Sequence, residues 1–255
     1  MKFRILGCGT STGVPRIGND WGDCSPGEPK NRRMRSSILA NIGKQTILVD
    51  CGPDLRAQLL DGNTQQIDRL IVTHDHADHC HGIDELRPLA QHVGAPIPLH
   101  ARQKTLDRLA VRFRYVFENV GLYSPILTPF AIEDDWTWGR AKVAFVDQPH
   151  GGITSLGLRF EEDEKSCGYA IDFHDLTLDM ADLYRGVDLW IADCLRRRPH
   201  PTHAHLDAVL GWAKELGVGQ LLLTHLDNSM DFASLSTTLP DWAQPAFDGQ
   251  EIELK

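Results

Sequence analysis

The sequence predicts an α/β fold, and three observations support this prediction. Short apolar runs of strand length recur along the chain, and turn residues bound each one. Segments with the apolar spacing of helices fall between several of these runs. The chain has 255 residues, of which 42% are hydrophobic, so its length and composition suit one large domain or two small ones with an ample core.

Strands are expected wherever a short apolar run is bounded by turn residues. These ranges are 2–7, 36–42, 45–50, 69–73, 97–100, 142–147, 155–160, 167–172, 188–193 and 220–224, with a last short strand at 250–253. The runs at 46–49 and 221–223 are apolar apart from Thr46, which is typical of strands buried on both faces of a sheet.

Helices are expected at 53–60, 105–115 and 206–216. The first begins with Pro53, a residue favoured in the first helical turn. The third is the clearest, because its apolar residues share one face and Gly217 follows as a C-cap. That face consists of Leu206, Val209, Leu210, Ala213 and Leu216.

Two stretches lack a regular pattern, and two others resemble each other. Residues 13–35 contain three Pro and four Gly, so we expect a long loop that is functional or mobile. Residues 116–135 are also irregular, and we expect a lid or a dimer surface there. The sequences at 69–75 and 220–227 both run from a buried strand into Thr-His. This match suggests two similar halves that present a histidine at equivalent strand ends.

The composition limits the class of protein. The chain has 35 acidic and 26 basic residues and a net charge of −9, which argues against a protein that wraps nucleic acid. No apolar run has the length of a membrane span, and residues 1–15 have the pattern of a strand and a glycine-rich turn rather than a signal peptide. The six cysteines form no CxxC pair, so we expect reduced thiols and a cytoplasmic location. The 12 histidines raise the question of a metal site.

The strongest chemical signal is the run at 73–79, which places three His and two Asp directly after an expected strand. Imidazole nitrogens and carboxylate oxygens are ligands suited to Zn, Mn or Fe. Alternation in an extended segment puts His74 and His76 on one side, whereas Asp78 and His79 can face a second centre. Without metal or other partners, such a crowded set of polar groups would be costly.

This run is an HxHxDH motif, and the chain resembles the metallo-β-lactamase-fold hydrolases. Four further segments resemble motifs of that superfamily in the same order: 47–52, 148–151, 168–172 and 223–225. The match extends over nearly the whole chain. The resemblance implies a single domain over 1–255, built as a four-layer αββα sandwich of two similar halves with the metal site at one edge.

The resemblance also implies a ligand set for two divalent ions, Mn or Zn. His74, His76 and His150 would bind the first ion, Asp78, His79 and His225 would bind the second, and Asp172 would bridge them. Asp50 would orient a ligand histidine from behind the site. Taken alone, His150, Asp172 and His225 could equally be a turn residue, a cap and a core histidine. With both ions and a bridging hydroxide, the centre would stay positive and would suit a phosphodiester.

The segment at 196–207 narrows the resemblance to one branch. It is similar to the phosphodiesterases that include tRNase Z and the phosphoribosyl cyclic phosphodiesterase of carbon–phosphorus lyase operons. In that branch a histidine before the following helix is the general acid, which here implies His203, with His205 and His200 as weaker candidates. Asp78 is the second catalytic candidate. Arg196 and the two arginines after it either clamp phosphate or form a solvated charge run, and helix capping by Thr202 remains an alternative for this segment.

Some relatives carry a small structural zinc site, from which this chain departs. Its loop offers only Cys24, and Asn stands at position 228 where those relatives have His, so we expect that zinc to be absent. The glycine-rich segment at 7–15 resembles the opening of the cyclic phosphodiesterases, although a tight turn explains it equally well.

We therefore expect a dinuclear metal-dependent phosphodiesterase that hydrolyses a small phosphodiester, cyclic or linear. Three alternatives stay open: a nuclease or tRNA 3′-processing enzyme of the same fold, a thioester or β-lactam hydrolase, and a non-catalytic metal-binding protein. The expected partner is a small anionic substrate rather than an extended nucleic acid or a membrane. A homodimer is suggested by family analogy alone.

Overall fold

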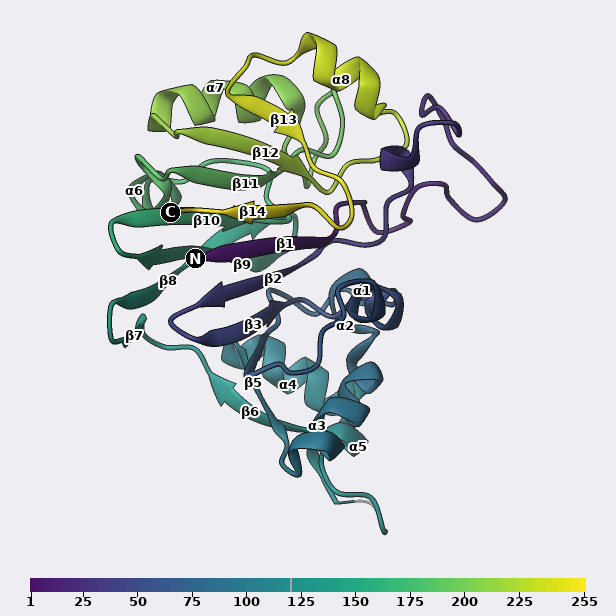
Figure 1. Cartoon of the computed structure of the whole chain (residues 1–255), viewed down its shortest axis with the longest axis vertical. Helices are drawn as coiled ribbons and strands as arrows, with labels where there is room; N and C mark the ends of the chain where they lie inside the picture. Colours follow the sequence, from purple (N-terminus) through teal and green to yellow (C-terminus); the bar gives the residue numbers. More distant parts are fainter. Residues whose placement is uncertain (120) are drawn as a thin grey trace.

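The computed structural model describes residues 1–119 and 121–255. Two seven-stranded sheets face each other, and helices cover the outer face of each (Figure 1). The order in the first sheet is β14 (Glu251–Glu253), β1 (Lys2–Gly7), β2 (Ser37–Ile42), β3 (Gln45–Val49), β4 (Arg69–Ile71), β5 (Ile97–Ala101) and β6 (Leu127–Ala131). The order in the second is β13 (Ala243–Pro245), β12 (Gln220–Thr224), β11 (Leu189–Asp193), β10 (Lys165–Ala170), β9 (Ile153–Glu162), β8 (Ala141–His150) and β7 (Trp136–Trp138).

The helices divide between the two sheets in chain order. The helices α1 (Leu55–Asp61), α2 (Ala77–Cys80), α3 (Arg87–Val93), α4 (Gln103–Arg112) and α5 (Arg114–Phe117) belong to the first half. The helices α6 (Leu178–Tyr184), α7 (Leu206–Leu216) and α8 (Phe232–Thr238) belong to the second. Short 3-10 turns occur at Pro29–Asn31 and Ile83–Leu86.

Three layers of apolar side chains hold the four structural layers together. The central core lies between the sheets and joins residues such as Phe3 and Ile38 to Leu158 and Ile191. A second core packs the first sheet against its helices, and a third packs the second sheet against α6, α7 and α8. Burial on both faces explains why residues 47–49 and 221–223 are continuously apolar. The predicted αββα sandwich is confirmed.

The two halves are similar, but the Thr-His match does not mark equivalent strands. Each sheet has an antiparallel side and a parallel side, so β3 corresponds to β10, β4 to β11 and β5 to β12. The two matching segments contain the ends of β4 and β12, which do not occupy equivalent positions in the two sheets. That prediction was wrong, because five matching residues reflect only that both strands are buried and end at the same polar edge.

Three strands and several short helices were not predicted. The strands β6, β7 and β13 lie at or near sheet edges, where Pro129 and Pro245 interrupt the strand pattern. The strand β6 lies within the segment 116–135, which was expected to be irregular; Val120 in that segment lies outside the described residues. Among the described residues, no helix combines the length and apolar character needed to cross a membrane.

Candidate active site

The predicted site residues gather where strands of both sheets end. His74 follows β4, His150 ends β8, Asp172 follows β10 and His225 follows β12. The strands β8, β10 and β12 run in the same direction, so their carboxyl ends share one edge of the second sheet. Residues from opposite ends of the sequence therefore meet in one place.

The chain leaves three strands, β3, β10 and β12, through an unusual backbone conformation. Asp50 after β3, Asp172 after β10 and His225 after β12 have φ angles of 64°, 52° and 58°. Non-glycine residues in this left-handed region are strained and tend to cluster at functional sites. Asp50 and Asp172 follow equivalent strands of the two halves, β3 and β10. The similarity of the two halves therefore extends to these two site residues.

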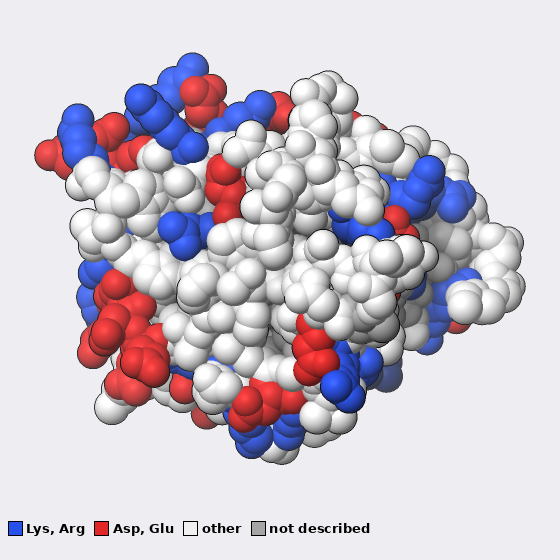
Figure 2. All heavy atoms as spheres, turned by 90° about the horizontal axis from the view of Figure 1, so that it is seen from below, with Lys and Arg blue, Asp and Glu red and all other residues white. Residues whose placement is uncertain are grey.

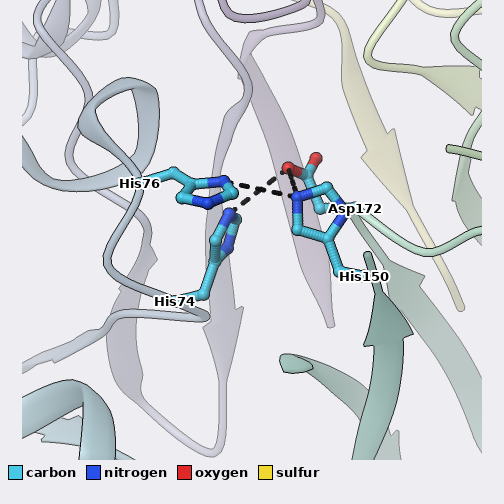
Figure 3. A group of neighbouring side chains, drawn as sticks. All are labelled: His74, His76, His150 and Asp172. Atoms are coloured by element: carbon cyan, nitrogen blue, oxygen red, sulfur yellow. Dashed lines mark hydrogen bonds and ion pairs between the residues drawn. The ribbon is translucent and has the colours of Figure 1, made fainter. Parts of the chain in front are cut away.

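A first cluster consists of His74, His76, His150 and Asp172, whose potential ligand atoms lie within 4.8 Å of one another (Figure 3). His76 Nδ1 lies 3.3 Å from His150 Nε2. The carboxylate oxygen Oδ2 of Asp172 lies 3.3 Å from His74 Nε2 and 3.3 Å from His150 Nε2. Three nitrogens and one carboxylate oxygen thus face a common point, which is a ligand set that divalent transition metals accept.

A second cluster consists of Asp78, His79 and His225. His79 Nε2 lies 3.2 Å from Asp78 Oδ2 and 3.5 Å from Asp172 Oδ2. His225 Nδ1 lies 3.3 Å from the other Asp172 oxygen, Oδ1. Asp172 therefore contacts members of both clusters, which is the placement expected of a bridging carboxylate.

The unpaired polar atoms of the site fit bound cations. Within the described part of the chain, the buried atoms His74 Nε2, His79 Nε2 and Asp172 Oδ1 make no hydrogen bond. Buried polar groups without partners are costly, and metal coordination would supply the missing partners. Burial lowers the pKa of His150 to about 4 and that of His225 to about 3, so both rings are neutral, as metal ligands must be.

Asp50 lies behind the second cluster and contacts His79. Its carboxylate lies 2.7 Å from His79 Nδ1 and accepts hydrogen bonds from the backbone N–H and the hydroxyl of Thr73, at 2.8 and 2.9 Å. These contacts fix the His79 ring with Nε2 toward the site. Gly52 lets this turn approach α2, because a Cβ at that position would lie 2.1 Å from the Asp78 carbonyl oxygen.

His203 lies beside the two clusters and is paired with a buried carboxylate that sequence reasoning missed. His203 Nδ1 lies 2.9 Å from Oδ2 of Asp193, the last residue of β11. Burial opposes a charge on His203, but the adjacent Asp193 outweighs this effect and raises the pKa of His203 to about 9. Because Nδ1 is engaged, Nε2 is the ring nitrogen left for a substrate. The available sequence signal was an Asp at the end of a buried strand.

A cavity of about 240 Å³ opens onto the site. It is lined by Ser11, His76, Asp78, His150, Gly151, Gly152, Ile153, Asp172, Thr202, His203 and His225. His200 packs against the His203 ring, with 5.2 Å between ring centroids, and His205 is the N-cap of α7. The guanidinium of Arg196 donates to the carbonyls of Arg198 and Pro199. Arg196, His200 and His205 are not among the residues that line the cavity.

Arg33 organises the loop 13–35 beside the segment that follows the last site histidine. Its buried guanidinium donates to the carbonyls of Asp227 and Met230 at 3.1 and 2.6 Å, and it contacts Cys24 Sγ at 3.8 Å. The backbone N–H of Asp23 donates to the carbonyl of Asn228. An arginine-centred network therefore joins this loop to the segment that follows the last site histidine.

The sequence signature of a β-lactamase superfamily domain matches residues 45–226, which include all the metal-ligand candidates. The chain belongs to the β-lactamase superfamily. Within this superfamily, a solved structure described as a new diphosphatase of the PhnP family is 33% identical. It superposes with a TM-score of 0.89, and the alignment covers 98% of this chain and 96% of that one.

Curated relatives include a ribonuclease Z and a longer octanoyltransferase. A ribonuclease Z of Mycolicibacterium gilvum is 26% identical over 231 residues, covering 77% of this chain and 79% of the relative. An octanoyltransferase of Porphyromonas gingivalis is 29% identical over 260 residues and covers 98% of this chain. This chain spans about half, 51%, of that longer relative. The chain is a metal-dependent hydrolase in a branch that includes PhnP-like and ribonuclease Z proteins.

Proposed function

We propose that this chain is a dinuclear metal-dependent phosphodiesterase acting on a small, anionic phosphodiester. The observation that carries the proposal is the meeting of two potential metal clusters at Asp172, with His203 beside them on the same cavity. The similarity to a diphosphatase and to a ribonuclease Z, the first named for a diphosphate and the second for RNA, supports hydrolysis at a phosphate group.

The residues would divide between two ions as their contacts suggest. His74, His76 and His150 would hold one ion, and Asp78, His79 and His225 would hold the other. Asp172, which contacts members of both clusters, would be shared. When bound, Mn²⁺ or Zn²⁺ would supply Lewis acidity, acidifying a water and offsetting charge on the phosphate. Both metals accept nitrogen and oxygen ligands of this kind.

The chain's own residues would orient the ligands and supply a proton. His150 Nδ1 lies 2.9 Å from the carbonyl oxygen of Thr202, which fixes Nε2 toward the cavity. Asp193 holds the Nδ1 side of His203 in the same way. His203 would then donate a proton from Nε2 to the leaving oxygen, a step for which imidazole is the usual general acid near neutral pH.

The cavity favours a small substrate over an extended nucleic acid. Its volume of about 240 Å³ suits a compact ester, and its lining includes no Lys, Arg, Phe, Tyr or Trp side chain. Figure 2 shows one face of the molecule, on which basic and acidic side chains are interspersed around a broad uncharged area. On this face there is no continuous basic stripe of the kind that tracks a phosphate backbone. The nuclease remains the second candidate because of the ribonuclease Z relatives.

Acyl transfer is less well supported, despite the octanoyltransferase relative. An eight-carbon acyl chain needs an apolar channel, but Ile153 is the one large apolar side chain among the residues lining the cavity. The activity in that relative's name need not reside in the half that this chain matches.

The proposal is tested with a panel of cyclic and linear phosphodiesters, a precursor tRNA and a thioester, using chain loaded with Mn²⁺ or Zn²⁺. We expect turnover of small diesters, with kcat on bis(p-nitrophenyl) phosphate reduced by about 10²–10⁴ in His203→Ala at unchanged metal content. The control is His92→Ala, which replaces an exposed histidine on α3. Cleavage of tRNA alone would establish the nuclease, and turnover of the thioester alone would overturn the phosphodiesterase.

A further inference from the structure

The loop between β4 and α2 carries two of the proposed metal ligands but has no regular structure of its own. His74 and His76 face the site, whereas Asp75 between them is absent from the cavity lining. The Asp75 side chain is only 10% exposed. A buried carboxylate requires compensating partners, and those of Asp75 come from a different element of the fold.

Both partners are arginines of α4. Arg108 Nη1 donates to Asp75 Oδ1 at 2.7 Å, and Arg112 Nη2 donates to Asp75 Oδ2 at 3.1 Å. Each carboxylate oxygen thus accepts a separate charge-assisted hydrogen bond, which is stronger and more directional than a neutral one.

Arg112 also reaches the backbone of the loop. Its Nη1 donates to the Asp75 carbonyl oxygen and lies 3.5 Å from Cys80 Sγ. Cys80 Sγ in turn lies 3.1 Å from the carbonyl oxygen of His76. Together, Arg112 and Cys80 contact two consecutive carbonyls of the loop, of which that of His76 also accepts the backbone N–H of His79 at the start of α2.

The helix α4 is a rigid support for these contacts. Arg108 and Arg112 are four residues apart and therefore lie on the same helix face. The neighbouring face buries Leu106 and Leu109 in the core beneath the first sheet. The position of the two guanidinium groups is therefore set by the core rather than by the loop that they hold.

We propose that Asp75, Arg108 and Arg112 form a clamp that positions His74 and His76 for metal binding. The three are positioning residues, because they act through the two histidines and do not line the cavity. This inference rests on the proposed metal-binding function. It predicts that loosening the clamp weakens metal binding more than it weakens the fold.

The test measures Zn²⁺ affinity by competition with a chromogenic chelator, together with the Tm of the metal-free chain. Substitutions behind metal ligands typically reduce affinity about 10–100-fold, and we expect this for Arg112→Met. Arg112→Lys, which keeps the charge but not the fork of donors, should fall between wild type and Arg112→Met. Arg114→Met is the control, since the Arg114 side chain is 77% exposed and pairs with Glu118.

A double-mutant cycle separates the clamp from a merely structural role. Asp75→Asn should weaken Zn²⁺ binding, and Asp75→Asn combined with Arg112→Met should be no weaker than the more affected single variant. A lower Tm with wild-type Zn²⁺ affinity in Arg112→Met would overturn the clamp but not the proposed function. A wild-type chain that binds neither Zn²⁺ nor Mn²⁺ would overturn both.

Discussion

Replacing Asp193 by Asn should slow turnover by loosening His203. The bond between them is 2.9 Å long, and the Asp193 side chain is fully buried. Hydrogen bonds to a charged group contribute about 1.5–3 kcal/mol, and about 1.4 kcal/mol corresponds to a factor of ten in rate. We therefore expect kcat to fall about 10–100-fold in Asp193→Asn, with little change in KM, because the carboxylate orients the acid rather than binding the substrate.

The assay is the hydrolysis of bis(p-nitrophenyl) phosphate at saturating metal, with metal content measured on the same samples. If Asp193 acts through His203, adding Asp193→Asn to His203→Ala should lower kcat no further. Asp182→Asn, a substitution of an exposed residue on α6, is the control for the loss of one carboxylate. Equal reductions of kcat by Asp193→Asn in the wild-type and His203→Ala backgrounds would refute the dyad.

Two further predictions concern the stability of the fold, at Gly52 and at His100. Gly52→Ala should destabilise the fold by about 1–3 kcal/mol in urea unfolding, since its Cβ would meet the Asp78 carbonyl oxygen at 2.1 Å; an unchanged midpoint would contradict this. Burial and the cation of Arg69 lower the pKa of His100 to about 4, below its unfolded value near 6.5. As the pH falls, the unfolded chain therefore takes up a proton at His100 before the folded chain does. The contribution of neutral His100 to the free energy of unfolding should be complete above about pH 6.5 and decline by up to about 3 kcal/mol as the pH falls toward 4. His100→Gln, which keeps an acceptor for Arg69, should show a flatter pH dependence of unfolding, and identical profiles would rule out this role.

The fold was predictable from the sequence where burial is continuous along an element. The predicted strand 45–50 and the predicted helix 206–216 each show their apolar pattern within a few residues. Their predicted bounds agree closely with β3 and α7 of the structure. The strands β6 and β13 were missed because proline and exposed positions break the alternation on which such a prediction depends. The four-residue helices α2 and α5 are too short to show a period.

Only part of the candidate site could be predicted from the sequence. The residues of HxHxDH are local in sequence, so their chemistry is visible without a fold. His150, Asp172 and His225 became candidates through the order of motifs in a resembling family, and the structure brings them within contact of that run. Asp193 and the Arg108–Arg112 pair had no such signal, because their roles depend on contacts between separate elements.

Asp172 is proposed to be shared by two metal ions, and metal analysis of purified wild-type chain and Asp172→Ala tests this sharing. We predict about two ions per wild-type chain, and fewer than one in Asp172→Ala that remains folded by circular dichroism. His203→Ala should retain the wild-type content, which separates the proton donor from the ligand set. A folded Asp172→Ala that keeps two ions per chain would show that Asp172 is not needed to hold them.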